Sequence, residues 1–312
     1  MSNFYMAFSV VCPLFLMMSL GYFLKILKLF NDHSLKELNA LCFKVFLPLL
    51  LFINVYQSKA SQVLQPKLIA FAVVSVVASY VIVFLVIPLI EKENNRRGVL
   101  IQGIFRSNFI LFGISMTTSL YGDAYVGITA VLIAFVIPIF NVLSVIALEA
   151  FSDGRMSIKK IIKGIITNPL ILASVIAFFF VQTGIKLPEI IETTIADIAK
   201  IATPLAFIIL GGSFKFSNIS VNFKPILIGV AGRLIVIPII LLPIAILLGF
   251  RNESLGVLLA LFASPTAVSS FVMAQQMGGD SELSGELVIF SSLASIVTIF
   301  VWIALLKQWH YL

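Results

Sequence analysis

Long apolar segments, separated by short polar stretches, run through the chain from one end to the other. Ten of them reach roughly 20 residues, the length that an α-helix needs to cross the hydrocarbon core of a bilayer. Backbone groups in that core find no water, so spanning segments are helices or closed barrels, and these segments lack the alternation of barrel strands. The pattern predicts an all-α membrane protein with ten transmembrane helices, at about 4–24, 36–57, 67–90, 98–121, 124–150, 162–184, 194–214, 224–249, 254–276 and 284–308.

The amino-acid composition agrees with this pattern. Of the 312 residues, 60% are hydrophobic and only 11% are charged, and the mean hydropathy of +1.12 is far above that of a soluble domain. The first apolar segment is long enough to be a span itself, so we expect no secretory signal and no cleavage. Cys12 and Cys42 both lie in apolar segments. We expect buried free thiols there, with no disulfide framework, metal site or cofactor.

The positive charges report on topology. The chain has 21 Lys and Arg against 14 Asp and Glu, but these charges are scattered over short loops and form no stripe for nucleic acid. Loops after the first, third, fifth and seventh segments hold twelve Lys and Arg, and the opposite side holds six. By the positive-inside rule, the richer loops are cytoplasmic. We therefore predict a multi-pass protein of the inner (plasma) membrane with both termini outside.

Prolines and polar residues recur at matching places in the two halves of the chain. Pro48 follows Pro13 by 35 residues, and Pro204 follows Pro169 by the same 35. Farther on, FRSNFILFGISMTTSLYGD in the first half matches FASPTAVSSFVMAQQMGGD in the second at an offset of 157 residues. The shared register indicates an internal repeat.

Each half contains five predicted spans, and an odd number places the second half upside down relative to the first. This inverted repeat is the plan of many secondary transporters, in which discontinuous helices build a substrate site near the middle of the membrane. We predict a first five-helix repeat at 1–150, a cytoplasmic linker at 151–160 and a second, inverted repeat at 161–312.

Polar residues sit at the middle of the fourth and ninth predicted spans. Asn108 lies about ten residues into its span and Pro265 about eleven, which places both about 15 Å deep at 1.5 Å per residue. Ser264 and Pro265 suit an N-cap and the first position of a helix, and Ser107 and Asn108 are good N-cap residues at the matching place. If both spans are interrupted here, two helix N-termini meet and offer unpaired N–H groups to an anion.

Two arginines in apolar segments have two interpretations each. Arg106 could pair with a substrate carboxylate, or it could neutralise the negative C-terminal end of the first half of its span. Arg233 leaves the same choice open. Asn108 is the strongest substrate-binding candidate, although a helix–helix hydrogen bond or a cap would also satisfy its amide. The candidate substrate-binding residues are Asn108, Ser107, Arg106, Pro265, Ser264, Thr266, Asn141 and Arg233.

Enzyme and channel functions are the alternatives. Asp123 and Asp280 follow glycines and suggest an intramembrane aspartyl-type hydrolase, but the inverted topology places them on opposite faces of the membrane, where they could not share a proton. The chain has no H-E-x-x-H pair and no nucleophile elbow, so no catalytic residue is predicted. An anion channel is the other alternative, and the sequence does not exclude it. The coupling ion could be absent, a proton or sodium.

Seven motifs in a fixed order resemble the auxin efflux carrier family, which includes plant auxin exporters and bacterial malate or malonate carriers. They are GYFLKILKLF, KVFLPLLLF, FRSNFILFG, LYGD, TNPLILA, TPLAFIILGGS and SPTAVSSFVMAQQMGGD. The family's span-4 asparagine falls on Asn108 and its span-9 crossover proline on Pro265. The chain departs from the family at Ile114 and Ser115, where a proline is usual.

The resemblance implies the fold of sodium/proton antiporters and bile-acid transporters. Helices 1, 2, 6 and 7 would form a scaffold, and helices 3–5 and 8–10 would form a transport domain in which discontinuous helices 4 and 9 cross. It also implies an elevator-like, alternating-access carrier for a small organic carboxylate, either a dicarboxylate or an aromatic weak acid. Efflux and homodimerisation through the scaffold are further implications.

Overall fold

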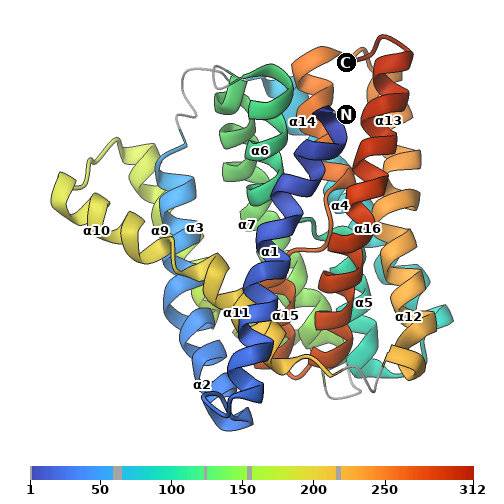
Figure 1. The fold of residues 1–312 in the computed structure, drawn as a ribbon. Helices are drawn as coiled ribbons and strands as arrows, with labels where there is room; N and C mark the ends of the chain where they lie inside the picture. The colour runs from blue at the N-terminus through green and yellow to red at the C-terminus, as the bar shows by residue number, and fades with distance from the viewer. Residues whose placement is uncertain (1, 59–64, 123–124, 153–156, 216–218) are drawn as a thin grey trace.

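The computed structural model describes residues 2–58, 65–122, 125–152, 157–215 and 219–312 (Figure 1). Over these residues the chain is helical and forms no strand beyond one isolated β-bridge. Both termini lie at the same end of the molecule (Figure 1). Asp123, which entered the hydrolase alternative, and the basic residues Lys59 and Arg155, which entered the topology count, lie outside the described residues.

Seven helical segments among the described residues are long and apolar enough to cross a membrane, which makes the chain an all-α membrane protein. Two contain a π-helical turn, η1 or η4, where the helix carries one extra residue. The segments are α1 (Ser2–Ile26), α2–η1–α3 (Asp32–Leu41, Cys42–Phe46, Leu47–Tyr56), α4 (Pro66–Ile90), α7 (Val126–Phe151), α10–α11 (Glu189–Ala199, Ala202–Ser213), α12–η4–α13 (Ile219–Ala231, Gly232–Val236, Ile237–Leu247) and α16 (Ser281–Gln308).

The sixth predicted span, 162–184, is a bent pair of helices. Helix α8 (Ile158–Thr167) begins four residues earlier than predicted and meets α9 (Pro169–Thr183) at an angle of 55°. The bend lies at Asn168, whose side chain accepts a hydrogen bond from the Leu170 amide at 2.9 Å and so caps α9. Pro169 occupies the first position of α9, where its missing N–H costs nothing.

The fourth and ninth predicted spans are interrupted. The first becomes α5 (Asn94–Phe105) and α6 (Phe109–Tyr121), and the second becomes α14 (Asn252–Ala263) and α15 (Val268–Gln276). The longest of these pieces has 13 residues, about 20 Å, so no piece alone crosses a core about 30 Å thick. Most residues of α5, α14 and α15 are buried by the surrounding helices.

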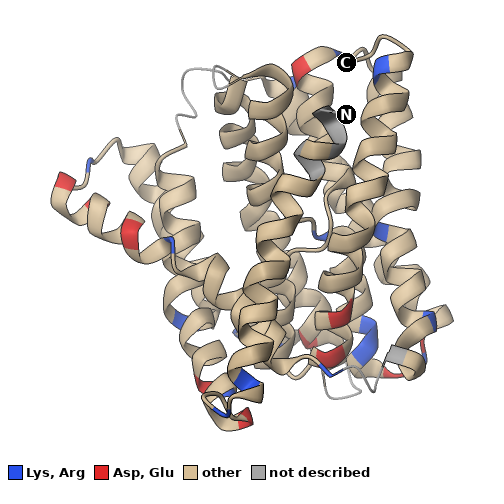
Figure 2. Cartoon of the chain, viewed as in Figure 1, with Lys and Arg blue, Asp and Glu red and all other residues tan. Residues whose placement is uncertain are grey.

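Glycines bring α1 and α11 into backbone contact. A Cβ atom added at Gly21 would lie 1.9 Å from the Ile208 carbonyl oxygen, and one at Gly211 would lie 1.9 Å from the Met18 oxygen. Helices in lipid associate through such small residues because burial from lipid gives little hydrophobic gain. Many large apolar side chains face outward, and Leu89 and Leu247 are among the most exposed of them. Charged residues gather at the ends of the molecule and on the arm that α9 and α10 form (Figure 2).

Candidate functional site

Two extended segments cross inside the helical body, at the interruptions of the two broken spans. Ser107 and Thr266 form an isolated antiparallel bridge, and the Asn108 amide donates to the Pro265 carbonyl at 2.7 Å. The hydroxyl of Thr266 donates to the Gly103 carbonyl at 2.8 Å. Main-chain groups outside a helix need hydrogen-bond partners in an interior without water. Each of the two segments therefore supplies some of the hydrogen-bond partners of the other.

The segment after α14 differs from the predicted cap. Ser264 ends α14, and its hydroxyl donates back to the Ala260 carbonyl. Helix α15 begins three residues beyond Pro265, at Val268, with Ala267 at its N-cap. The prediction that Ser264 caps a helix whose first residue is Pro265 is therefore wrong. The physical reason is that this serine satisfies a carbonyl of the helix it ends, and the proline lies in the extended crossing.

Two helices, α6 and α15, begin at the crossing, so their N-termini lie beside it. Asn108 is the N-cap residue of α6, but its side chain makes no capping hydrogen bond. The first N–H groups of α6 and α15 have no carbonyl one turn earlier in their own helices, and each N-terminus carries partial positive charge. The crossing thus offers two electropositive helix ends inside the protein.

Arg233 neutralises the opposite helix ends. It lies on η4 with 1% of its surface exposed. All five of its N–H groups donate to main-chain carbonyls at the C-terminal ends of α5 and α14. The acceptors are the oxygens of Ile104, Phe105, Leu261, Phe262 and Ser264. Of the two interpretations for a buried arginine, this geometry matches the neutralisation of helix ends.

Arg106 has partners of a different kind. Its guanidinium donates to the Asn141 side-chain oxygen at 2.8 Å and to the Ser269 hydroxyl at 2.9 Å. It also donates to the Ser144 hydroxyl at 3.2 Å and to the Met273 sulfur. These partners are all neutral, and none of them is a carboxylate or a main-chain carbonyl. The Arg106 side chain is only 4% exposed. Among the described residues, none of those that hydrogen-bond this nearly buried cation is an anion.

A cavity of about 70 Å³ opens beside Arg106. Its polar end consists of Arg106, Ser107, Asn108 and Ser269. The Ser107 hydroxyl and the Asn108 amide nitrogen are buried and have no hydrogen-bond partner among the described residues. The other walls are formed by Leu47, Leu50, Leu51, Phe109, Ile110, Leu111, Ile137, Leu170, Thr203, Ala267 and Val268. The cavity therefore combines a cation and two unpaired donors with an apolar wall.

The structure separates the predicted site residues into three groups. Three of them, Arg106, Ser107 and Asn108, line the cavity, and Asn141 supports it through Arg106. Ser264, Pro265 and Thr266 belong to the crossing but do not line the cavity, and Arg233 lies behind the crossing on the helix ends. Ser144 and Met273 were not predicted, because a serine and a methionine in apolar helices resemble ordinary packing residues.

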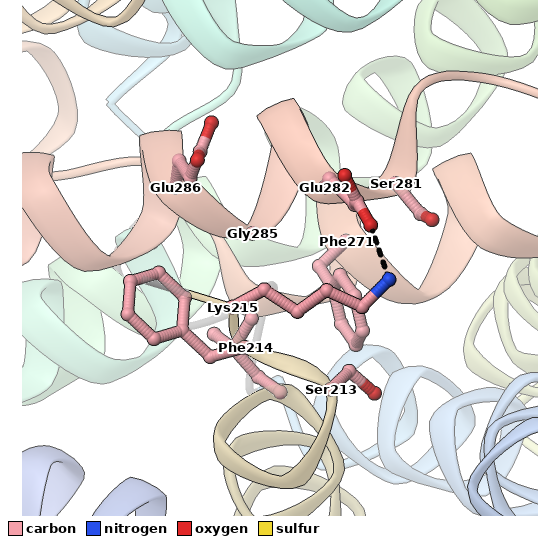
Figure 3. A pocket seen from close by; sticks show the side chains of 9 residues that line it. Ser213, Phe214, Lys215, Phe271, Ser281, Glu282, Gly285 and Glu286 are labelled. Atoms are coloured by element: carbon pink, nitrogen blue, oxygen red, sulfur yellow. Dashed lines mark hydrogen bonds and ion pairs between the residues drawn. The ribbon is translucent and has the colours of Figure 1, made fainter. Parts of the chain in front are cut away.

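A second cavity, of about 20 Å³, lies between the end of α11 and the start of α16 (Figure 3). Lys215 and Glu282 form an ion pair of 2.8 Å across it, and this contact raises the pKa of the Lys215 ammonium. Glu286 points away from the pair and accepts from Asn222 at 2.7 Å. Because both charges already have partners, this cavity is the weaker candidate for an anion. Among the described residues, no three or more His, Cys, Asp and Glu side chains gather as a metal site would require.

Comparison with known proteins agrees with the membrane architecture. The sequence profile described as "membrane transport protein" matches residues 6–303. The chain is 22% identical over 305 residues to the uncharacterized transporter YfdV of Escherichia coli K12, covering 93% of this chain and 95% of that protein. It is 23% identical over 295 residues to an uncharacterized transporter of Methanothermobacter thermautotrophicus, covering 94% and 96%. The chain is a membrane transporter and belongs to the membrane transport protein family, which is the auxin efflux carrier family that its motifs resemble.

Proposed function

We propose that the protein is an alternating-access carrier for a small organic carboxylate, which binds in the cavity beside Arg106. One observation carries the proposal: a nearly buried guanidinium with only neutral partners shares a cavity with two unpaired donors, from Ser107 and Asn108. A charge at the centre of a spanning helix costs about 2.5–3.5 kcal/mol on insertion scales. An incoming carboxylate would offset this cost and would accept the free hydrogen bonds.

A carboxylate fits this chemistry better than a cation or a neutral solute. Its two oxygens match the planar fork of a guanidinium, and they accept from hydroxyl and amide donors. The N-termini of α6 and α15 add partial positive charge at the same place. The present volume holds roughly five water-sized groups, so a carboxylate with one or two carbons fills it and a larger substrate needs the walls to separate.

The position of the cavity supports alternating access. We propose the ten-span inverted repeat, with repeats at 1–150 and 161–312 joined by the linker 151–160. In that arrangement the wall opposite the polar end comes partly from the scaffold, through Leu47, Leu170 and Thr203, and the polar end comes from the transport domain. A substrate at such a boundary is carried when one domain moves against the other, as in transporters whose site lies at a repeat interface.

Direction, membrane and assembly follow from the resemblance and the charge distribution. We propose efflux across the inner (plasma) membrane by a homodimer that associates through the scaffold, with both termini outside. A hydrolase or an anion channel would use the same apolar helices differently. The nearly buried guanidinium of Arg106, which has only neutral partners, favours binding of an anion inside the protein, which a carrier requires in its occluded state.

Reconstitution tests the function. Purified protein in liposomes preloaded with unlabelled malate, malonate or an aromatic acid is given the labelled form of each outside. We expect saturable accumulation of label that depends on the internal substrate. In counterflow a carrier takes unlabelled substrate out and returns to the inner face with labelled substrate bound. Flux that rises linearly with concentration and shows no counterflow would indicate a channel, and cleavage of the compound would indicate an enzyme.

A further inference from the structure

We infer that α8 lies at the membrane surface and binds the headgroups of anionic phospholipids. This helix differs from every spanning segment because none of its ten residues is buried. Its sequence, IKKIIKGIIT, contains three lysines and no acidic residue. A helix of this length and composition does not cross the hydrocarbon core of the bilayer by itself, and α8 buries no side chain in the interior of the protein.

The residues of α8 divide into three faces. Ile158, Ile162 and Ile166 recur every four residues and form one apolar row, with 72%, 51% and 64% of their surfaces exposed. Lys159 and Lys163 are exposed and follow the first two isoleucines by one position, about 100° around the axis. A third face meets the protein, where a Cβ atom added at Gly164 would lie 3.0 Å from the Glu149 side chain of α7.

The bend at Asn168 gives α8 its place. Helix α9 has 15 residues, about 22 Å, which falls short of a core about 30 Å thick. Helix α8 is about 15 Å long and departs from α9 by 55°. With α9 placed along the membrane normal, α8 rises by less than about 10 Å and runs mostly along the bilayer surface. The pair thereby reaches the interface, where α8 meets headgroups and the first acyl carbons.

Charge and hydrophobicity together select the occupant of this surface. An exposed isoleucine row beside a lysine row matches the boundary between acyl chains and phosphates, where lysine stems lie on apolar surface and ammonium groups reach out. Lysines near a bilayer attract anionic lipids. A soluble acidic protein would pair with the lysines but would leave the isoleucine row in water. Lys160 already has an interaction within the protein, so the inference uses only Lys159 and Lys163.

Depth measurements test the placement. Nitroxide labels are attached to Ile162→Cys and Lys163→Cys in a Cys12→Ser background, leaving buried Cys42 in place, with the unsubstituted background as the labelling control. In phosphatidylcholine vesicles with phosphatidylglycerol, we expect the label at 162 to favour collisions with oxygen and the label at 163 to favour collisions with a water-soluble nickel chelate. Two labels with equal exposure to water, or two labels at the bilayer centre, would overturn the inference.

Lipid selectivity tests the partner. In the double variant Lys159→Gln/Lys163→Gln, we expect the preference for spin-labelled phosphatidylglycerol over phosphatidylcholine at the protein surface to fall several-fold. The matched control Lys186→Gln/Lys307→Gln removes two exposed lysines elsewhere and should keep that preference. An unchanged preference in the α8 variant, or an equal loss in both variants, would refute anionic lipid binding by α8.

Discussion

Arg106 and Arg233 carry the same charge in apolar surroundings, but their hydrogen bonds go to different acceptors. Arg233 meets five main-chain carbonyls at two helix ends, and Arg106 meets neutral side chains beside a cavity. The residues that flank each arginine in the sequence do not tell the two roles apart. Each arginine has some of its acceptors in segments more than a hundred residues away. The polar residues at 106–108 stand out in the sequence of an apolar span, whereas the hydrogen-bond partners of each arginine emerge only when the helices are packed together.

Removing the charge of Arg106 should impair transport more than folding. In Arg106→Gln the cavity keeps a polar side chain but loses its cation, and a hydrogen bond to a charged group is worth about 1.5–3 kcal/mol. We expect the KM for the best carboxylate to rise about tenfold or more. The Tm in detergent should stay close to that of the wild type. Removing a buried charge that has only neutral partners also removes its desolvation cost, which offsets the lost hydrogen bonds. A lowered Tm with an unchanged KM would reverse the assignment.

Removing Arg233 should act on folding first. Arg233→Gln leaves several buried carbonyls without donors, and each orphaned group costs about 1–3 kcal/mol. We expect a markedly lower Tm and poor recovery from the membrane. Arg233→Lys keeps the charge but has only three donors and lacks the planar fork of the guanidinium. Its Tm should therefore lie between those of the wild type and Arg233→Gln. Wild-type thermal unfolding of Arg233→Gln would disprove the helix-end role.

At the scale of elements, hydropathy locates the segments and misplaces some of their ends. The interruptions of 98–121 and 254–276 were predictable, because polar residues and a proline at mid-span mark them. The start of α15 at Val268 was not, because proline suits a first helical position and equally suits an extended segment. The bend before Pro169 escaped prediction, since the corresponding Pro13 lies inside the continuous helix α1.

The contact between α1 and α11 depends on two glycines. In Gly211→Ala the new Cβ would collide with the Met18 carbonyl oxygen unless the helices separate. Overpacking of this kind costs about 1–3 kcal/mol, and we expect a Tm lower by several degrees. Ser213→Ala, at the end of the same helix, is the control and should unfold like the wild type. Equal thermal stability of Gly211→Ala and this control would mean that the close approach is not required.

At the scale of the whole molecule, the site is a product of distant segments. The polar end of the cavity comes from 106–108 and Ser269, and the wall includes Leu47, Leu170 and Thr203. Apolar wall residues carry no local signal, because a leucine facing a cavity and a leucine facing lipid look alike in a hydropathy pattern. The all-helical membrane character and the family could be predicted from sequence, but the wall opposite the cation could not.

The central claim is that the crossing presents unpaired donors to a carboxylate, and Asn108 offers the sharpest test. Its amide nitrogen has no partner among the described residues, so Asn108→Ala should leave folding intact while the KM for the best carboxylate rises about tenfold. Ser115→Ala, on the same helix but bonded to the Leu111 carbonyl, is the matched control. Counterflow in proteoliposomes should be impaired in the first variant and normal in the second. Transport by Asn108→Ala at the wild-type rate and KM would contradict the account.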